Sequence, residues 1–296
     1  MTVYNMISKI IKKSNKLFFI YFISFFLVIL TPILLLSFSS YNLVVSSVQQ
    51  EISRANMNAL RQTNSTVDRL LNEINTLSIQ LGLDGRIFAA SRSPENSFLL
   101  NDVKDRIKRL ATEHLNVYMI QLYFKHNNQI ISSEGADHVY DQHEFDQWIS
   151  KMEETSSNDI WLPVRSFTNQ DGNTIRILTL VRKIPVAFDE TMGYVAIHLY
   201  EDGLLAPLKT MNPNKELNIY LTTTSGEVIS AHTPATSLEP RMNLSDLSER
   251  LQSGQEGSVT AQSGDQKVML SYSQPNTYGW ILVSETPLNH LYLNLQ

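Results

Sequence analysis

The chain has 296 residues, with 24 lysines and arginines against 29 aspartates and glutamates, and it contains no cysteine. The lack of cysteine excludes disulfides, thiolate zinc sites and cysteine nucleophiles together. The acidic balance, a formal net charge of −5 at pH 7, disfavours nucleic acid and anionic lipid headgroups as direct partners.

Residues 17–38, LFFIYFISFFLVILTPILLLSF, are predicted to form a transmembrane helix. The segment carries no charged residue, and at about 1.5 Å per residue it would reach about 33 Å, enough to cross the hydrocarbon core of a bilayer. Pro32 is compatible with this prediction, because neighbouring groups in a membrane helix can satisfy the freed carbonyl. A cleaved signal peptide is the alternative, but its apolar core normally spans only about 7–15 residues.

Residues 1–16 are predicted to be a cytoplasmic tail. They contain Lys9, Lys12, Lys13 and Lys16 and no acidic residue, and lysines in a short segment beside a span mark its cytoplasmic side. We therefore expect a single-pass protein of the cell membrane, with a cytoplasmic N-terminus and an extracellular bulk. Subtracting the four lysines leaves 20 basic against 29 acidic residues, so no nucleic-acid contact is expected of this bulk.

Residues 40–82 are predicted to form one long helix that continues from the span as a stalk. Apolar positions recur at alternating steps of three and four, as on a helix with one apolar face: Leu60, Thr63, Val67, Leu70, Ile74, Leu77 and Leu81. Two interpretations are open. The stripe is the seam of a homodimer, because sustained heptad spacing is what such a seam needs, or it only covers a sheet of its own domain.

After the stalk the pattern changes to short strands separated by polar turns, and the order of features occurs twice. The strand–turn–strand units are 118–124 with 129–132, and 218–221 with 227–230. Each is followed by a glycine, an aromatic residue, a short strand and a helix, in 193 GYVAIHLYEDGLLAPL 208 and 279 GWILVSETPLNHLYL 293. The predicted fold class is therefore α+β, with two tandem antiparallel-sheet modules at 83–210 and 211–296.

This outline resembles the double Cache sensor region of membrane-bound bacterial receptors, whose modules are PAS-like. The run from Trp161, WLPVRSFTNQDGNTIRILTLVRKIPVAFDETMGYVAIHL, resembles the hairpin, apolar strand, glycine and last strand of the membrane-distal module. The closing YSQPNTYGWILVSETPLNHLY resembles the end of the membrane-proximal module. The N-terminal EISRANMNALRQTNSTVDRLLNEINTLSIQL is most similar to AraC-type transcriptional regulators, and somewhat less to sensor histidine kinases, of Gram-positive bacteria.

The resemblance implies a sensor whose distal module, 83–210, binds a small extracellular solute. In such receptors the last helix of the proximal module leads into a second membrane span and a cytoplasmic output domain. The sequence ends after a helix-like start at Pro287, which predicts either a truncated receptor or a single-pass protein whose output comes from a partner. The alternative function is a single-pass co-receptor that docks another membrane protein.

Catalysis is not expected, and neither is a cofactor. The sequence has no Gly-x-Ser-x-Gly, P-loop or dinucleotide-binding motif. The spacing of His138 and His143 matches no standard helical metal pair, and a metal site needs three or four ligands. A solvated loop is therefore favoured there, and no metal site is predicted.

Trp148 and Trp161 are two of the three tryptophans, and they bracket the most polar loop of the distal module. They are candidates for an aromatic clamp that stacks on a flat or sugar-like ligand. Burial in the core is the alternative, because tryptophan is mostly buried whatever its role.

The amino-acid-binding members of the family use an Arg two residues before the helix Trp, a Tyr after it and an Asp on the last distal strand. The resemblance places Asp146, Ile149 and His198 at these positions. An acid instead of the Arg and a histidine instead of the Asp argue against an α-amino acid ligand. We therefore expect a saccharide or another neutral polyol, with these ligand-binding candidates: Trp148, Trp161, Asp146, Arg165, His198 and Tyr123.

Arg176 and Arg182 are six residues apart in one extended run, so they are predicted to share a face of the sheet. They either line the pocket or lie on a solvent face. The solvent face is favoured, because antiparallel sheets usually keep one face wet.

The proximal module, 211–296, is expected to be empty and to act as a spacer between the pocket and the membrane. Its polar segment 233–257 has no tryptophan and little charge with which to hold a solute. Trp280 is then expected to be a packing residue whose ring is buried against the sheet or the terminal helix.

Overall fold

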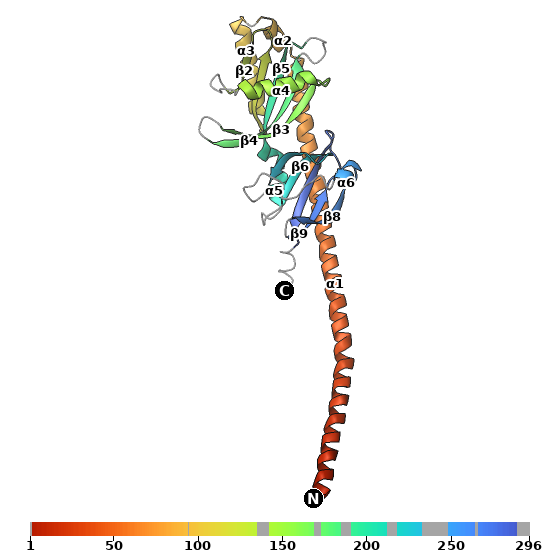
Figure 1. Ribbon diagram of the computed structural model, residues 1–296. Helices are drawn as coiled ribbons and strands as arrows, with labels where there is room; N and C mark the ends of the chain where they lie inside the picture. Colours follow the sequence, from red (N-terminus) through yellow and green to blue (C-terminus); the bar gives the residue numbers. More distant parts are fainter. Residues whose placement is uncertain are drawn as a thin grey trace. The chain divides into compact units, whose positions relative to one another are not determined.

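The structure is a computed structural model of the chain, and it describes residues 2–93, 95–134, 142–168, 173–184, 191–211, 218–232, 248–263 and 266–288 (Figure 1). The chain divides into two units, residues 1–55 and residues 56–296. Each unit is described by itself below.

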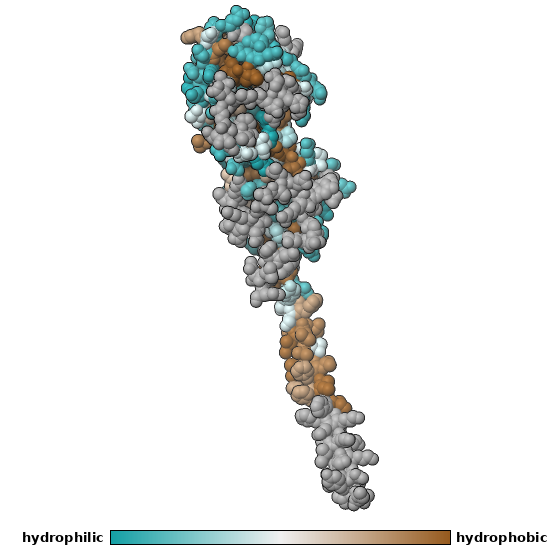
Figure 2. Space-filling view, turned by 60° about the vertical axis from the view of Figure 1, so that its left-hand side comes forward, coloured by the Kyte–Doolittle hydropathy of each residue, from teal (hydrophilic) through white to brown (hydrophobic). Residues whose placement is uncertain are grey.

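Helix α1 (Thr2–Gly82) is continuous and includes Pro32, so the predicted tail, span and stalk all lie in one helix. From Ile20 to Phe38 its side chains are exposed and mostly apolar, and Figure 2 shows this stretch as a hydrophobic band. The stretch is long and apolar enough to cross a membrane. The boundaries of the tail, span and stalk stay predictions.

In the second unit, the apolar stripe of α1 is buried within its own chain. Leu70, one of the seven predicted positions, is half-buried and packs against the core. The other six are buried: Leu60, Thr63, Val67, Ile74, Leu77 and Leu81. Leu71 is fully buried beside Leu70. The sheet-covering interpretation therefore explains this stripe, and a homodimer through the stalk stays a prediction.

The first sheet has five antiparallel strands in the order β2-β1-β5-β4-β3. The strands are β1 (Val117–Phe124), β2 (Gln129–Ser132), β3 (Asp159–Thr168), β4 (Thr174–Ile184) and β5 (Gly193–Tyr200). Three helices accompany it: α2 (Gly85–Arg92), α3 (Ser97–Glu113) and α4 (Gln142–Glu154). The buried residues of α1 and α3 belong to one core with the first sheet, while α4 lies across the opposite face (Figure 1).

The second sheet repeats this topology, with the order β7-β6-β10-β9-β8. Its strands are β6 (Asn218–Thr223), β7 (Val228–His232), β8 (Gly257–Ser263), β9 (Gln266–Tyr272) and β10 (Trp280–Pro287), and helix α6 (Ser248–Gln252) lies between β7 and β8 in the chain. Helix α5 (Glu201–Met211) follows β5 directly and contacts β4 and β5 of the first sheet. The predicted α+β fold with two antiparallel-sheet modules is confirmed. The helix expected to begin at Pro287 is not seen at that residue, because Pro287 ends β10 and pairs with Val268; residues 289–296 lie outside the described part.

Helices α2 and α3 begin where side chains cap them. Asp84 accepts a hydrogen bond from the backbone nitrogen of Arg86 at 2.9 Å before α2. Asn96 accepts hydrogen bonds from the backbone nitrogens of Phe98 at 3.1 Å and Leu99 at 3.3 Å before α3. These oxygens satisfy amide groups that have no partner inside the helix, so both helix starts are encoded locally.

The two modules are equivalent, but their alignment differs by one residue from the prediction. The sequence aligned Tyr194 with Trp280 as the aromatic residue after a glycine. Tyr194 lies on the face of the first sheet away from α1, whereas Trp280 packs in the core that α1 shares. Side chains alternate along a strand, so the alignment has to shift by one residue to match the faces. The shift that also matches the first residues of β5 and β10 pairs Ile281 with Tyr194, and Glu285 with His198.

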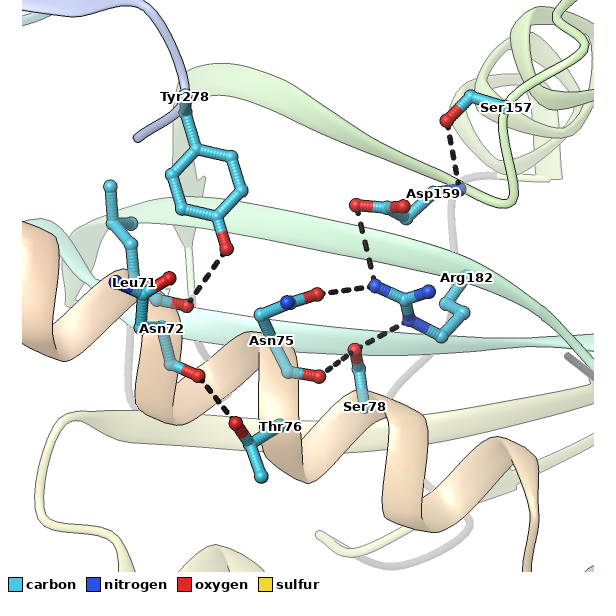
Figure 3. Close-up of polar contacts among 9 residues, drawn as sticks. All are labelled: Leu71, Asn72, Asn75, Thr76, Ser78, Ser157, Asp159, Arg182 and Tyr278. Atoms are coloured by element: carbon cyan, nitrogen blue, oxygen red, sulfur yellow. Dashed lines mark hydrogen bonds and ion pairs between the residues drawn. The ribbon is translucent and has the colours of Figure 1, made fainter. Parts of the chain in front are cut away.

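Arg176 and Arg182 share a face as predicted, but it is neither the candidate pocket nor a solvent face. Arg182 is only 4% exposed; its Nε donates to Ser78 Oγ of α1 at 2.7 Å, and its guanidinium also bonds to Asn75 and pairs with Asp159 at 3.4 Å (Figure 3). Burial lowers the pKa of Arg182. The solvent interpretation was wrong for Arg182, because α1 supplies two of its polar partners, Ser78 and Asn75.

Arg176 joins the two modules. Its Nε lies 2.9 Å from Oε2 of Glu201, the first residue of α5, and its guanidinium donates to the carbonyl of Ala231 on β7 at 3.1 Å. Glu201 is 4% exposed and also accepts a hydrogen bond from Ser230. A buried carboxylate therefore bridges a strand of the first sheet to a strand of the second.

Candidate functional site

The candidate site is the face of the first sheet that points away from α1. On β5, Val195, Ile197 and Leu199 belong to the core shared with α1, so the alternate residues Tyr194, Ala196 and His198 lie on the other face. Helix α4 covers this face, because Trp148 and Met152 pack in one cluster with Val181, Tyr194 and Ala196. This side-chain cluster is separate from the core beneath α1.

Three buried polar side chains meet in the middle of this face. His198 on β5 is fully buried; its Nδ1 lies 2.9 Å from Thr179 Oγ1 on β4, and its Nε2 lies 2.7 Å from Gln121 Oε1 on β1. The carbonyl oxygen of Gln121 only accepts, so His198 donates from Nε2 and accepts from the Thr179 hydroxyl at Nδ1. We call these three residues the polar triad.

The imidazole of His198 is neutral at ordinary pH. Its pKa is lowered from 6.5 to about 3, first by burial and then by the positive charge of Arg165. Arg165 lies on β3 just after an irregularity in the pairing with β4, and it is opposite Ile177, which shares a face with Thr179. The triad therefore offers neutral hydrogen-bonding groups with a cation nearby.

The edge of the site beside β1 is aromatic and charged. The rings of Tyr123 and Tyr194 stack with centroids 6.2 Å apart. Lys125 lies 5.7 Å from the centroid of the Tyr194 ring and forms an ion pair of 2.6 Å with Glu153 of α4. The hydrogen bond between them raises the pKa of Lys125 and lowers that of Glu153. Burial raises the pKa of Tyr194.

Of the predicted binding residues, the structure brings four to this face: Tyr123, Trp148, Arg165 and His198. Asp146 belongs to α4, but its side chain lies outside the described residues. Gln121 and Thr179 were missed. Both are on the strands that flank β5, so they become recognisable only once the strand order and register around His198 are known.

Trp161 lies on the opposite side of its strand from this site. Its neighbours Ile160 and Leu162 pack with the Trp148 cluster, whereas Trp161 packs against the core shared with α1. Its ring meets those of Tyr278 and Trp280 edge-on, with centroids 5.7 and 5.6 Å away. The predicted clamp between Trp148 and Trp161 is therefore not formed, because the two indoles lie on different faces of the sheet.

Trp280 is a buried packing residue, with 6% of its surface exposed. Its ring contacts Trp161 of the first sheet and Tyr278, and it shares a core with residues of its own sheet. Of the two predicted surroundings, the structure therefore shows the sheet. Trp161, Tyr278 and Trp280, which we call the aromatic trio, connect the two modules.

The second unit also contains a polar groove of about 510 Å³ between α1 and the segment 273–277. The Arg61–Glu256 ion pair and a hydrogen bond from Thr277 N to Asp68 Oδ1 of 3.0 Å cross it. These contacts attach α1 to the second module. Among the described residues, no group of three or more His, Asp or Glu side chains could hold a metal ion; His138 is outside that part, as is the side chain of His143.

No protein-family model and no curated protein matches the chain. Solved structures do match. The extracellular domain named for the histidine kinase soHK1S-Z6 superposes with a TM-score of 0.59 at 13% identity, covering 86% of this chain and 99% of that one. The ligand-binding domain of Mlp24 with asparagine gives a TM-score of 0.54 at 12% identity, over 84% of this chain and 98% of that one.

A third match is the sensory domain of the Campylobacter jejuni chemoreceptor Tlp3 with isoleucine bound, with a TM-score of 0.54, 12% identity, and coverage of 82% of this chain and 95% of that one. At such identities the likeness concerns the fold. The chain therefore has the α+β, double Cache-like fold of extracellular sensor domains.

Proposed function

We propose that the chain is the sensing part of a membrane-anchored signalling receptor and that the face of the first sheet beneath α4 binds a small extracellular solute. The observation that carries the proposal is the polar triad. Burying a histidine and its two polar partners costs desolvation free energy, and apolar residues on this face would make the fold more stable. The polar residues therefore suggest a role in binding. Their place between the sheet and a covering helix is a usual place for a small-molecule site.

The ligand we propose is a saccharide or another neutral polyol. The three residues of the triad are neutral, and the amide of Gln121 and the hydroxyl of Thr179, which His198 holds in place, each both donate and accept, which suits hydroxyl groups. Trp148 supplies an aromatic surface beside Ala196, and Tyr123 and Asp146 remain candidate contacts. Trp161 is withdrawn from this set, because its ring is used in the aromatic trio.

An amino acid is the second candidate. Solved domains of the same fold are named with asparagine and isoleucine bound. In this chain Arg165 is the cation near the triad, and a guanidinium suits a carboxylate. Against this candidate, the position expected to hold an ammonium group carries the neutral His198 in place of an acid.

The route for the signal is short. Thr179 of the triad and Arg182 lie three residues apart on β4, one on the site face and one bonded to α1. A change at the site face would therefore act on α1 through the same strand. We propose further that residues 17–38 cross the membrane with residues 1–16 inside the cell, that the stalk pairs in a homodimer, and that the output is an AraC-type regulator or a histidine kinase.

The test is ligand-dependent stabilisation of the full chain in detergent. A panel of mono- and disaccharides, polyols and amino acids is added, and the melting temperature is recorded; a ligand that binds the folded state stabilises it by RT ln(1 + [L]/Kd). Gln121→Met should remove the shift while the variant still folds, because methionine has a similar length but no hydrogen-bonding amide. Glu134→Gln, an exposed carboxylate in the same module, is the control. No shift with any member of the panel would contradict the proposal.

A further inference from the structure

Glu285 is a buried carboxylate that has no cationic partner among the described residues. It lies on β10, its side chain is 2% exposed, and it accepts hydrogen bonds from Tyr220 Oη at 2.9 Å and Asn218 Nδ2 at 3.2 Å. Within the described residues, no lysine, arginine or histidine forms an ion pair with it. A buried carboxylate normally has a cationic partner, because its desolvation is otherwise uncompensated.

The position of Glu285 repeats that of His198. Both lie on the central strand of their sheet, on the face away from α1. His198 comes four residues after Tyr194, and Glu285 comes four residues after Ile281, the residue aligned with Tyr194. The partners correspond as well. Tyr220 bonds to Glu285 from the strand equivalent to β1, as Gln121 bonds to His198 from β1 itself. The polar group at the centre of the candidate site is therefore present in both modules, with an acid in the second.

The hydrogen bonds of Glu285 and Asn218 leave one acceptor oxygen on each residue without a hydrogen bond from the described part of the chain. Both donors bond to Oε2, so Oε1 accepts no hydrogen bond from the described part of the chain. Asn218, directly opposite Glu285 on β6, uses its amide nitrogen in this contact, which leaves its Oδ1 as a second acceptor. Asn218 is only half-buried. The Asn218 side of the pair therefore lies next to the surface of the module.

We propose that Glu285 and Asn218 form a second binding site, in the second module, for a primary ammonium group. An ammonium group would supply the positive charge that no described residue places beside the Glu285 carboxylate. It also has three N–H donors, which suit a carboxylate oxygen and an amide oxygen side by side. This goes beyond the proposed function, and it replaces the expectation that this module is an empty spacer. That expectation rested on the segment 233–257, which does not include either residue.

The experiment measures the melting temperature of the full chain in detergent at constant ionic strength. Methylammonium chloride is compared with sodium chloride and with tetramethylammonium chloride, which has no N–H donor. The melting temperature should rise with the methylammonium concentration beyond the effect of the other two salts. Glu285→Gln, which keeps the shape and an acceptor oxygen, should reduce that rise to the level of sodium chloride.

Two further variants make the outcome decisive. Glu227→Gln removes an exposed carboxylate of the same module and should leave the methylammonium shift unchanged. Asn218→Ala keeps Glu285 and should weaken the shift. An equal shift in the wild type and in Glu285→Gln, a shift with tetramethylammonium as large as with methylammonium, or no methylammonium shift in the wild type would each overturn the proposal. A Glu285-dependent shift with calcium chloride alone would overturn the ammonium class. The saccharide panel reports on the first sheet, so the two proposals can fail separately.

Discussion

Arg182 on β4 donates a hydrogen bond from Nε to Ser78 Oγ on α1 at 2.7 Å, and both residues are almost completely buried. Ser78 in turn donates to the carbonyl of Asn75 at 2.7 Å, within α1. The contact joins the predicted stalk to the strand that also carries Thr179 of the polar triad. It is the polar connection through which the site face and α1 are coupled most directly in the proposed mechanism.

Replacing Arg182 by alanine should lower the free energy of unfolding by about 3–5 kcal/mol, because Asp159 and two polar groups of α1 lose their partner in a buried place. Arg182→Lys should recover part of this loss, since it keeps the charge without the planar fork. Urea unfolding of the full chain measures both. Arg86→Ala is the control, because its side chain is 47% exposed, and its loss should stay below about 1 kcal/mol. Equal effects of Arg182→Ala and Arg86→Ala would contradict the structure.

The aromatic trio should connect the two modules energetically. Trp280→Ala should cost about 3–5 kcal/mol of stability, because a buried ring is removed, and Trp161→Ala should also be destabilising. The double variant should cost less than the sum of the two by about 0.5–1.5 kcal/mol, the coupling of one aromatic pair. Additive losses would show that the rings do not interact. A Trp280→Ala protein that unfolds like the wild type would show that the ring is not packed.

His198 should make the fold less stable in acid. Its pKa is about 3 when folded against an ordinary value of 6.5, so between these values the unfolded chain binds a proton that the folded chain does not. The contribution of His198 to the free energy of unfolding is complete above pH 6.5. As the pH decreases below that value, the contribution decreases by up to about 1.4 kcal/mol per pH unit. Unfolding of the wild type and of His198→Gln, compared across this range, isolates the effect. Parallel pH profiles for the two proteins would exclude a neutral buried histidine.

Gly193 should not tolerate a side chain. A Cβ atom there would lie 2.0 Å from the carbonyl oxygen of Tyr123, a backbone atom of the neighbouring strand, so β1 and β5 would have to separate. Gly193→Ala should cost at least about 1–3 kcal/mol, the usual range for an overpacked interior. Gly85→Ala is the matched control, because a Cβ atom added at Gly85 would have no other atom within 4 Å. Thermal unfolding distinguishes the two, and similar melting temperatures would contradict the close strand approach.

The sequence by itself determined the elements and their repetition. The uncharged run through residues 17–38, the stripe from Leu60 to Leu81 and the alternation in the strands each follow from local periodicity, which needs no knowledge of neighbours. The α+β class with two antiparallel-sheet modules followed from the repetition of these patterns, whereas the strand order within each sheet did not. His198 was found as a site candidate from a resemblance to a family motif.

Only the tertiary structure decided which face each side chain occupies. Alternation shows that the side chains of Trp161 and Leu162 point to opposite faces of the sheet, but it does not show which of the two faces α1. A shift of one residue exchanges the two faces of a strand. The repeat alignment matched the glycine and the aromatic residue after it without knowledge of the faces, and it therefore paired Tyr194 with Trp280, which lie on different faces.

The partners across strands were equally out of reach of the sequence. Gln121 and Thr179 are separated from His198 by 77 and 19 residues, and Ser78 is separated from Arg182 by 104 residues. Local patterns carry no information about such pairs, because they are set by strand order and register. The polar triad and the Arg182 contact with α1 are therefore properties of the fold, built from residues whose types alone are compatible with an exposed strand.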